Sequence, residues 1–227
     1  YLEAFYADAS YTHMVFPGMV FIAHPSELGT LYSLAELEEL SALCRRYRIP
    51  LYLDGARLAY GLAAPDTDVT LADIARLADA FYIGGTKCGA LCGEAVVFPR
   101  GGMPRHFLTH AKQHGALLAK GRLLGVQFDT LFTNNLYGEV GRAAIAAADE
   151  LRRILRDANC TFFRESPTNQ QFVVLENDQV EALAERIRFS TWEKLGDGRT
   201  VIRLVTSWST TPDDLAALEA ALHEVMQ

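Results

Sequence analysis

Short apolar runs rich in β-branched and aromatic residues alternate with helix-like stretches over the first half of the chain. The first three runs are Val20–Ala23, Leu51–Leu53 and Phe81–Ile83. This alternation is typical of strand–helix–strand units and predicts a mostly parallel sheet. A fourth run, Ala95–Phe98, follows after only eleven residues, Gly84–Glu94. Because a helical crossover barely fits in that length, we expect this run to pair antiparallel.

Two capping patterns mark where helices begin between these strands. Ser33 precedes Glu36 by three residues, and Thr70 precedes Asp73 in the same way. A hydroxyl and an acid at this spacing satisfy backbone N–H groups at a helix start. Beyond Ser33, apolar residues recur at near-helical spacing: Leu34, Leu37, Leu40, Cys44 and Tyr47. We therefore predict one helix in each stretch.

The second half of the chain has a different character. Long helices are predicted around Pro104–Leu124 and near Asn134–Ala158, and we expect a hinge within Arg100–Asn134. Two lobes with a cleft between them are the natural arrangement. We place the later part of a large ligand-binding domain at residues 1–125 and a small α+β domain, including a long connecting helix, at residues 126–227.

The last seventy residues resemble a small α+β layer. Strands are predicted at Phe172–Leu175 and Val201–Val205, with a helix at Gln179–Arg188. A final helix is predicted after the sequence Thr-Pro-Asp-Asp at 211–214, which supplies an N-cap, a proline at the first helical position and acids near the positive helix end. The expected fold class is thus α/β, a mostly parallel sheet with helices on both faces, plus this smaller α+β domain.

Composition excludes several classes of protein. The 227 residues are 50% hydrophobic and 22% charged, which is typical of a chain that buries a core. A net charge of −7 without a basic run argues against nucleic acid and anionic membranes as partners and favours a small molecule. No apolar stretch is long enough for a spanning helix. Four cysteines in a chain of this length suggest reduced thiols in a cytoplasmic protein.

Two neighbouring strand ends carry chemically distinctive residues. Asp54-Gly55-Ala56-Arg57 follows the second strand, and a Gly-Gly-Thr-Lys sequence ending at Lys87 follows the third. Ligands of open α/β sheets bind beyond the carboxyl ends of the strands, so we expect Asp54 and Lys87 to lie close together. A lysine among glycines can condense with an aldehyde, and pyridoxal phosphate also requires a carboxylate at its ring nitrogen. The alternatives are a surface lysine and a carboxylate that caps a turn.

Further residues strengthen this interpretation by resembling a known family. The matching segments are His13–Pro17, Glu27–Tyr32, Asp54–Leu58, Phe81–Lys87 and Arg203–Trp208. Together they resemble the low-specificity threonine aldolase group of the β-eliminating lyases, which are pyridoxal-phosphate enzymes of the aspartate-aminotransferase-like fold. The family's phosphate-binding loop and ring-stacking residue precede the first strand and have no counterpart here. The chain also begins at Tyr1 without Met, so we expect it to be the later part of a longer protein.

The resemblance implies roles for individual residues. Lys87 would form the Schiff base with the cofactor, Asp54 would pair with the pyridinium nitrogen, and Arg57 would help hold cofactor and substrate. Arg203 would clamp the substrate carboxylate, for which a planar guanidinium offers two parallel hydrogen bonds. Either arginine could instead be a solvated surface charge.

Two other matches have simpler alternatives. His13 resembles the family's histidine near the substrate hydroxyl, where a base takes a proton as the Cα–Cβ bond breaks, but it could equally cap a turn. Thr86 could donate its hydroxyl to the cofactor phosphate, or it could cap the turn that precedes the lysine.

The activity implied by the resemblance is retro-aldol cleavage of L-threonine or L-allo-threonine to glycine and acetaldehyde. β-Elimination or aminotransfer on the same scaffold is the alternative within the enzyme class. A catalytically inactive relative that acts only in oligomerisation is the alternative outside it. Because relatives of this fold assemble as dimers or tetramers, we expect a homodimer or homotetramer.

Two features suggest metal ligands at first sight. Cys88 and Cys92 lie beside the lysine but lack partners at zinc spacing, so packing explains them better. His106, His110 and His114 recur every four residues on one predicted helix, a pattern more often found on a solvated face. We expect no metal site.

Overall fold

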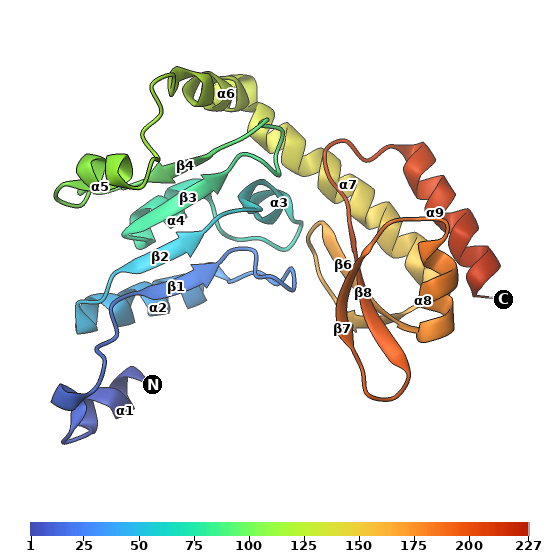
Figure 1. Cartoon of the computed structure of the whole chain (residues 1–227), viewed down its shortest axis with the longest axis horizontal. Helices are drawn as coiled ribbons and strands as arrows, with labels where there is room; N and C mark the ends of the chain where they lie inside the picture. The colour runs from blue at the N-terminus through green and yellow to red at the C-terminus, as the bar shows by residue number, and fades with distance from the viewer. Residues whose placement is uncertain (227) are drawn as a thin grey trace.

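The computed structural model describes residues 1–226, which form two sheets joined by one long helix (Figure 1). The first sheet has the order β1-β2-β3-β4. Its strands are β1 (Val20–Ala23), β2 (Leu51–Asp54), β3 (Ala80–Gly84) and β4 (Glu94–Val97). The first three strands run parallel and β4 pairs antiparallel with β3, which confirms both sequence predictions.

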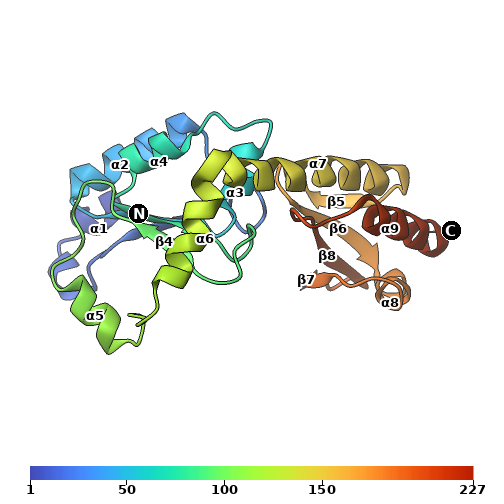
Figure 2. The same ribbon diagram turned by 90° about the horizontal axis from the view of Figure 1, so that it is seen from above.

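Helices α2 (Leu34–Tyr47) and α4 (Leu71–Leu77) lie on the same side of this sheet (Figure 2). Both begin at complete capping boxes, Ser33 with Glu36 and Thr70 with Asp73, as predicted. The strands turn alternate residues toward these helices, because successive side chains of a strand point to opposite faces. The buried strand residues are Ile22, Leu51, Leu53, Phe81 and Ile83.

The N-terminal segment lies at the edge of the sheet where the strands begin (Figure 1). It contains α1 (Leu2–Ala7) and a short 3-10 helix, η1 (Tyr11–His13). The ring of Tyr6 stacks on Tyr47, the last residue of α2, with ring centres 5.2 Å apart. Because α2 ends just before β2 begins, this contact holds the segment away from the carboxyl ends of the strands.

The predicted helix at Pro104–Leu124 is wrong in its length. The structure has two helices there, α5 (Phe107–Gln113) and α6 (Arg122–Phe132). Gly115 interrupts them with a φ of +70°, a left-handed conformation that glycine adopts without strain. No residue between positions 100 and 130 is buried, and α6 reaches the core only through Phe128 and Leu131 near its end, so few apolar positions mark the helix bounds here.

Helix α7 (Leu136–Asp157) belongs to both hydrophobic cores. Its first half packs on α3 (Leu58–Ala63), after the short 3-10 helix η2 (Thr133–Asn135). The first core takes Tyr137, Val140, Ala144 and Ile145 from α7, and the second takes Leu151, Ile154 and Leu155. The predicted long connecting helix is thus present, whereas the domain boundary at 125/126 stays a proposal.

The second sheet is antiparallel, with the order β5-β6-β8-β7. Its strands are β5 (Thr161–Arg164), β6 (Gln170–Glu176), β7 (Ser190–Lys194) and β8 (Arg199–Val205). Helices α8 (Asn177–Ala184) and α9 (Pro212–Val225) complete the predicted α+β layer, and α9 begins at a capping box of Thr211 and Asp214. Within residues 1–226 no helix combines the length and apolar character needed to cross a membrane.

Candidate active site

The ends of β2 and β3 approach each other so closely that only glycine fits. A Cβ on Gly55 would lie 2.1 Å from the carbonyl oxygen of Tyr82, and one on Gly84 would lie 2.4 Å from that of Ala56. The Gly84 N–H donates to the Gly55 carbonyl at 2.9 Å. These contacts fuse the Asp54 turn and the Lys87 turn into one rim, as the sequence predicted.

Two tyrosine hydroxyls anchor the backbone of the lysine turn. Tyr137 of α7 donates to the carbonyl of Gly84 at 3.1 Å and accepts from the N–H of Ala59 at 3.2 Å. Tyr60 of α3 donates to the carbonyl of Lys87 itself. Both phenols are buried, so their hydrogen bonds are shielded from water. The turn that carries Lys87 is therefore held at both ends by buried tyrosine hydroxyls.

The electrostatic surroundings of Lys87 lower the pKa of its amine. The residue is exposed at the rim, yet partial desolvation is the largest cause that lowers its pKa, followed by repulsion from Arg57. Asp54, Glu94 and Cys88 act in the opposite direction and offset part of this effect. These interactions also place Arg57 and Asp54 in the immediate neighbourhood of the amine.

Arg57 of the first lobe and Arg203 of the second lie close enough to interact electrostatically. Arg57 is half-buried, and burial is the largest cause that lowers its pKa, with the positive charge of Arg203 second. Neither guanidinium forms an ion pair with a carboxylate within residues 1–226. Two neighbouring cations without anions make a site suited to an incoming carboxylate or phosphate.

Neutral groups hold Arg203 in place. Its Nη1 donates to Oε1 of Gln170 at 3.3 Å, and its Nη2 donates to the hydroxyl of Ser190 at 3.4 Å. The guanidinium carbon lies 5.6 Å from the ring centre of Trp192, within range of a cation–π interaction. The orientation of Arg203 is thus restricted without a paired carboxylate within residues 1–226.

The carboxylate of Asp54 is held through one of its two oxygens. Oδ1 accepts from the hydroxyl of Tyr82 at 2.5 Å and from the N–H of Ala56 at 2.9 Å. In the described part of the chain Oδ2 accepts no hydrogen bond. This oxygen is available to a protonated ring nitrogen.

The structure gathers four of the six predicted site residues: Lys87, Asp54, Arg57 and Arg203. Thr86 is next to the lysine and exposed, and its hydroxyl makes a long 3.5 Å hydrogen bond to the carbonyl of Gly93, which fits the turn-capping alternative. His13 belongs to η1 in the N-terminal segment, which lies where the strands begin (Figure 1), whereas Lys87 follows the end of β3, so the two are not brought together within this chain.

Sequence reasoning missed several residues of this site. Tyr60, Tyr82, Tyr137 and Gln170 carry no charge, and tyrosines within apolar stretches resemble ordinary core residues. Only the position of Tyr82, which alternates with buried residues two places before the strand's end, hinted that its side chain shares a sheet face with Asp54.

The cysteines and histidines that suggested metal ligands differ in their exposure. Cys88 is fully buried, and burial raises the pKa of its thiol to about 11, whereas Cys92 is exposed. His106, His110 and His114 are exposed around α5. The described residues contain no group of three or more potential metal ligands.

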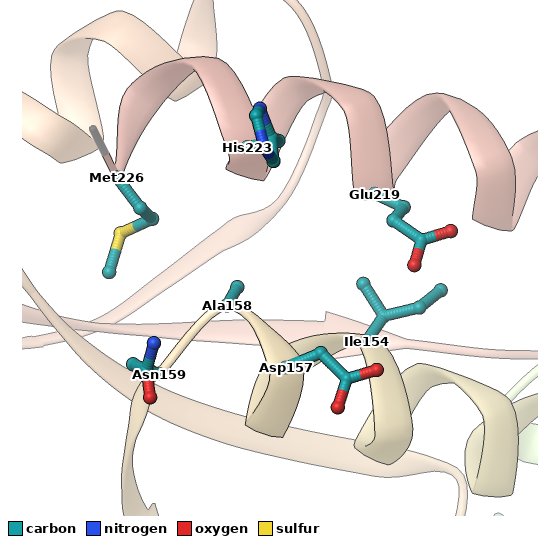
Figure 3. A pocket seen from close by; sticks show the side chains of 7 residues that line it. All are labelled: Ile154, Asp157, Ala158, Asn159, Glu219, His223 and Met226. Carbon is teal, nitrogen blue, oxygen red and sulfur yellow. The ribbon is translucent and has the colours of Figure 1, made fainter.

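A hollow of about 220 Å³ lies between the end of α7 and α9 (Figure 3). Its lining includes two carboxylates, Asp157 and Glu219, and Arg153 forms ion pairs with both of them. Because its acids are already paired and none of the rim residues lines it, this hollow is separate from the lysine site.

Sequence comparisons identify related proteins. The β-eliminating lyase family model matches residues 2–186. A low-specificity L-threonine aldolase of Pseudomonas aeruginosa is 27% identical over 216 residues, which cover 94% of this chain and 61% of that protein. A second, from a Pseudomonas species, is 28% identical over 218 residues with the same coverage.

Two solved structures are similar to this chain to different degrees. Threonine aldolase from Leishmania major has a TM-score of 0.93 and 39% identity, covering all of this chain and 66% of that one. Serine palmitoyltransferase from Sphingomonas wittichii shares the fold alone, with a TM-score of 0.62 and 16% identity over 91% of this chain and 55% of that one.

These likenesses show the aspartate-aminotransferase-like fold that the sequence implied. The chain spans about three fifths, 61%, of the length of the curated relatives it matches. The family match covers most of the chain, and its Gly-Gly-Thr-Lys turn and Asp-Gly-Ala-Arg turn meet at one rim. The chain belongs to the β-eliminating lyase family.

Proposed function

We propose that this chain forms the catalytic rim of a pyridoxal-phosphate-dependent amino-acid lyase. The observation that carries the proposal is that a lysine of lowered pKa and a carboxylate with an open oxygen meet at the ends of β3 and β2. Arg57 lies beside them and interacts electrostatically with Arg203 of the second sheet, and neither arginine pairs with a carboxylate within residues 1–226. The residues present fit the cofactor: Lys87 offers an amine to its aldehyde, and Oδ2 of Asp54 offers an acceptor to its ring nitrogen. When bound, the cofactor supplies an electron sink for the bond that breaks at the substrate Cα.

The chain's own residues bind and orient. Asp54 keeps a proton on the ring nitrogen, and Tyr82 fixes the carboxylate that does so. Arg57 and Arg203 would bind the carboxylate of an amino acid, and the position of that carboxylate would decide which bond at the substrate Cα is broken. Tyr60 and Tyr137 hold the backbone of the turn that carries Lys87, whose amine would bind the cofactor aldehyde.

The substrate we propose is a β-hydroxy-α-amino acid, L-threonine or L-allo-threonine, cleaved to glycine and acetaldehyde. The names of the relatives from Pseudomonas and Leishmania support this choice over elimination or aminotransfer. We also propose that the active form is a homo-oligomer in the cytoplasm, on the same analogy.

Cofactor binding is tested by adding pyridoxal phosphate and recording absorbance above 400 nm, about where protonated Schiff bases absorb. The unaltered chain should develop this band and Lys87→Ala should not. Lys112→Ala, which removes an exposed lysine of α5, is the control and should behave like the unaltered chain. Equal bands in all three proteins would contradict the assignment of Lys87.

The reaction is tested on the same samples by measuring acetaldehyde, pyruvate and keto acid release. Acetaldehyde from L-threonine or L-allo-threonine supports retro-aldol cleavage. Pyruvate from serine would point to β-elimination, and a keto acid to aminotransfer. Absence of all three products with an intact cofactor band would favour a non-catalytic relative that contributes only to oligomerisation.

A further inference from the structure

Gln170 occupies an unusual position between the two lobes. It is the first residue of β6, and its side chain is fully buried. Its Oε1 accepts from Nη1 of Arg203 at 3.3 Å, and its Nε2 donates to the carbonyl of Glu27 at 3.2 Å. Glu27 lies in the loop that follows β1. One amide group thus links the arginine of the small lobe to the sheet edge of the large lobe.

The same junction contains further neutral polar contacts. The hydroxyl of Ser166 donates to the carbonyl of Gly29 at 3.2 Å, in the same loop that Gln170 reaches. Gln171, the next residue, bonds only within its own segment, donating to the carbonyls of Ser166 and Thr168. Gln170 is therefore a buried side chain that connects the loop after β1 to Arg203.

The choice of an amide at position 170 has an electrostatic consequence. A carboxylate there would form an ion pair with Arg203 and neutralise it before any ligand arrived. An amide oxygen accepts the same hydrogen bond without cancelling the charge. The Nε of Arg203 is also buried and has no hydrogen-bond partner in the described residues, so the guanidinium depends on its Nη contacts for orientation.

We propose that Gln170 is a positioning residue that orients Arg203 toward the substrate carboxylate and keeps its charge available. This inference rests on the proposed function of Arg203 as the carboxylate clamp. Gln170 itself does not touch substrate. Because Gln170 is also bonded to the Glu27 carbonyl, it fixes the position of the Arg203 guanidinium relative to the rim that carries Lys87 and Arg57.

The first test needs neither cofactor nor activity. In nitrogen-15 NMR spectra, the Nε–H signal of Arg203, identified by its loss in Arg203→Lys, should exchange slowly with water because it is buried. Gln170→Ala should speed this exchange by about tenfold or more, since the guanidinium loses an acceptor. An unchanged signal and exchange rate in Gln170→Ala, or no protected signal in the unaltered chain, would overturn the proposal.

The second test measures glycine affinity from the change in visible absorbance of the cofactor-loaded chain. Gln170→Glu should weaken glycine binding by about tenfold or more, because the new carboxylate pairs with Arg203. Gln171→Glu is the matched control: it introduces the same charge at the adjacent buried position, away from Arg203, and should leave glycine affinity within about twofold. Urea unfolding of both variants separates stability losses from binding losses.

The outcomes distinguish this inference from the proposed function. If Arg203→Ala leaves glycine affinity unchanged, the clamp role of Arg203 fails, while the NMR test still decides whether Gln170 orders it. If Arg203→Ala weakens binding but Gln170→Glu binds glycine as tightly as the unaltered chain, the positioning role of Gln170 is wrong and the clamp stands. Equal loss of affinity in Gln170→Glu and Gln171→Glu would also overturn it, as a purely structural effect.

Discussion

The hydroxyl of Tyr82 on β3 donates a 2.5 Å hydrogen bond to the carboxylate of Asp54 on β2. Neighbouring strands thus hold the acid that would face the cofactor ring, one supplying the carboxylate and the other its donor. The backbone N–H of Ala56 supplies a second donor to the same oxygen. The carboxylate is oriented before any ligand binds, which lowers the cost of binding.

Tyr82→Phe should weaken pyridoxal phosphate binding about tenfold or more, because one donor to a charged acceptor is worth about 1.5–3 kcal/mol. The dissociation constant is measured by titrating absorbance. Tyr52→Phe is the control, since the Tyr52 hydroxyl makes no hydrogen bond within residues 1–226. Equal affinity of the two variants would show that the Tyr82 hydroxyl does not support Asp54.

Arg57→Gln should shift cofactor binding by Lys87 to higher pH. The positive charge of Arg57 lowers the pKa of the Lys87 amine, so its removal raises that pKa and the neutral, reactive amine appears later in a pH titration. The measurement is the midpoint of band formation against pH. Arg142→Gln, which removes a surface arginine paired with Glu139, should leave the midpoint in place.

Tyr137→Phe should lower the free energy of unfolding by about 1–3 kcal/mol, because the carbonyl of Gly84 and the N–H of Ala59 lose a buried partner. Urea titration gives this value. Tyr6→Phe removes a hydroxyl that has no such bond in the described residues and should change stability by less than about 0.5 kcal/mol. A Tyr137→Phe protein as stable as Tyr6→Phe would mean that water replaces the lost contacts.

His24 should make the fold acid-sensitive. Burial lowers the pKa of this histidine from its ordinary value of 6.5 to about 4, with a smaller opposing effect from Asp68. Between these values the unfolded chain binds a proton that the folded chain does not. Stability is therefore complete above about pH 6.5 and falls by at most about 3 kcal/mol as the pH drops to 4.

Urea unfolding of the unaltered chain, His24→Gln and His13→Gln at several pH values checks this sign. The slope of stability against pH should become shallower only in His24→Gln, whatever its absolute stability. A shallower slope in His13→Gln would assign the titration to another group. An unchanged slope in His24→Gln would do the same.

Local signals in the sequence were sufficient for much of the fold. The helix starts at Ser33, Thr70 and Thr211 were predictable because a capping box involves only neighbouring residues. Strands β5 and β7 escaped prediction because most of their residues are exposed and their partner strands alone define them. The break near Gly115 was missed because its surroundings carry no buried periodic face.

The part of the site that could be predicted consists of charged residues that directly follow strands of the parallel sheet. Asp54 and Lys87 follow parallel strands, so their convergence follows from the order of elements. His13 did not fit this logic. It precedes β1, so it lies where the strands begin, whereas Asp54 and Lys87 follow the carboxyl ends of strands. The side chains of Gln170 on β6 and Arg203 on β8 are joined by a hydrogen bond, and a contact between strands so far apart in sequence leaves no local pattern.

Helix α7 contributes residues to both hydrophobic cores, so the unfolding of one lobe is coupled to that of the other. Neither lobe can open without exposing part of the apolar stripe of this helix to water. The amide hydrogens in the middle of α7 should therefore exchange with solvent only through global unfolding, and calorimetry should record a single melting transition.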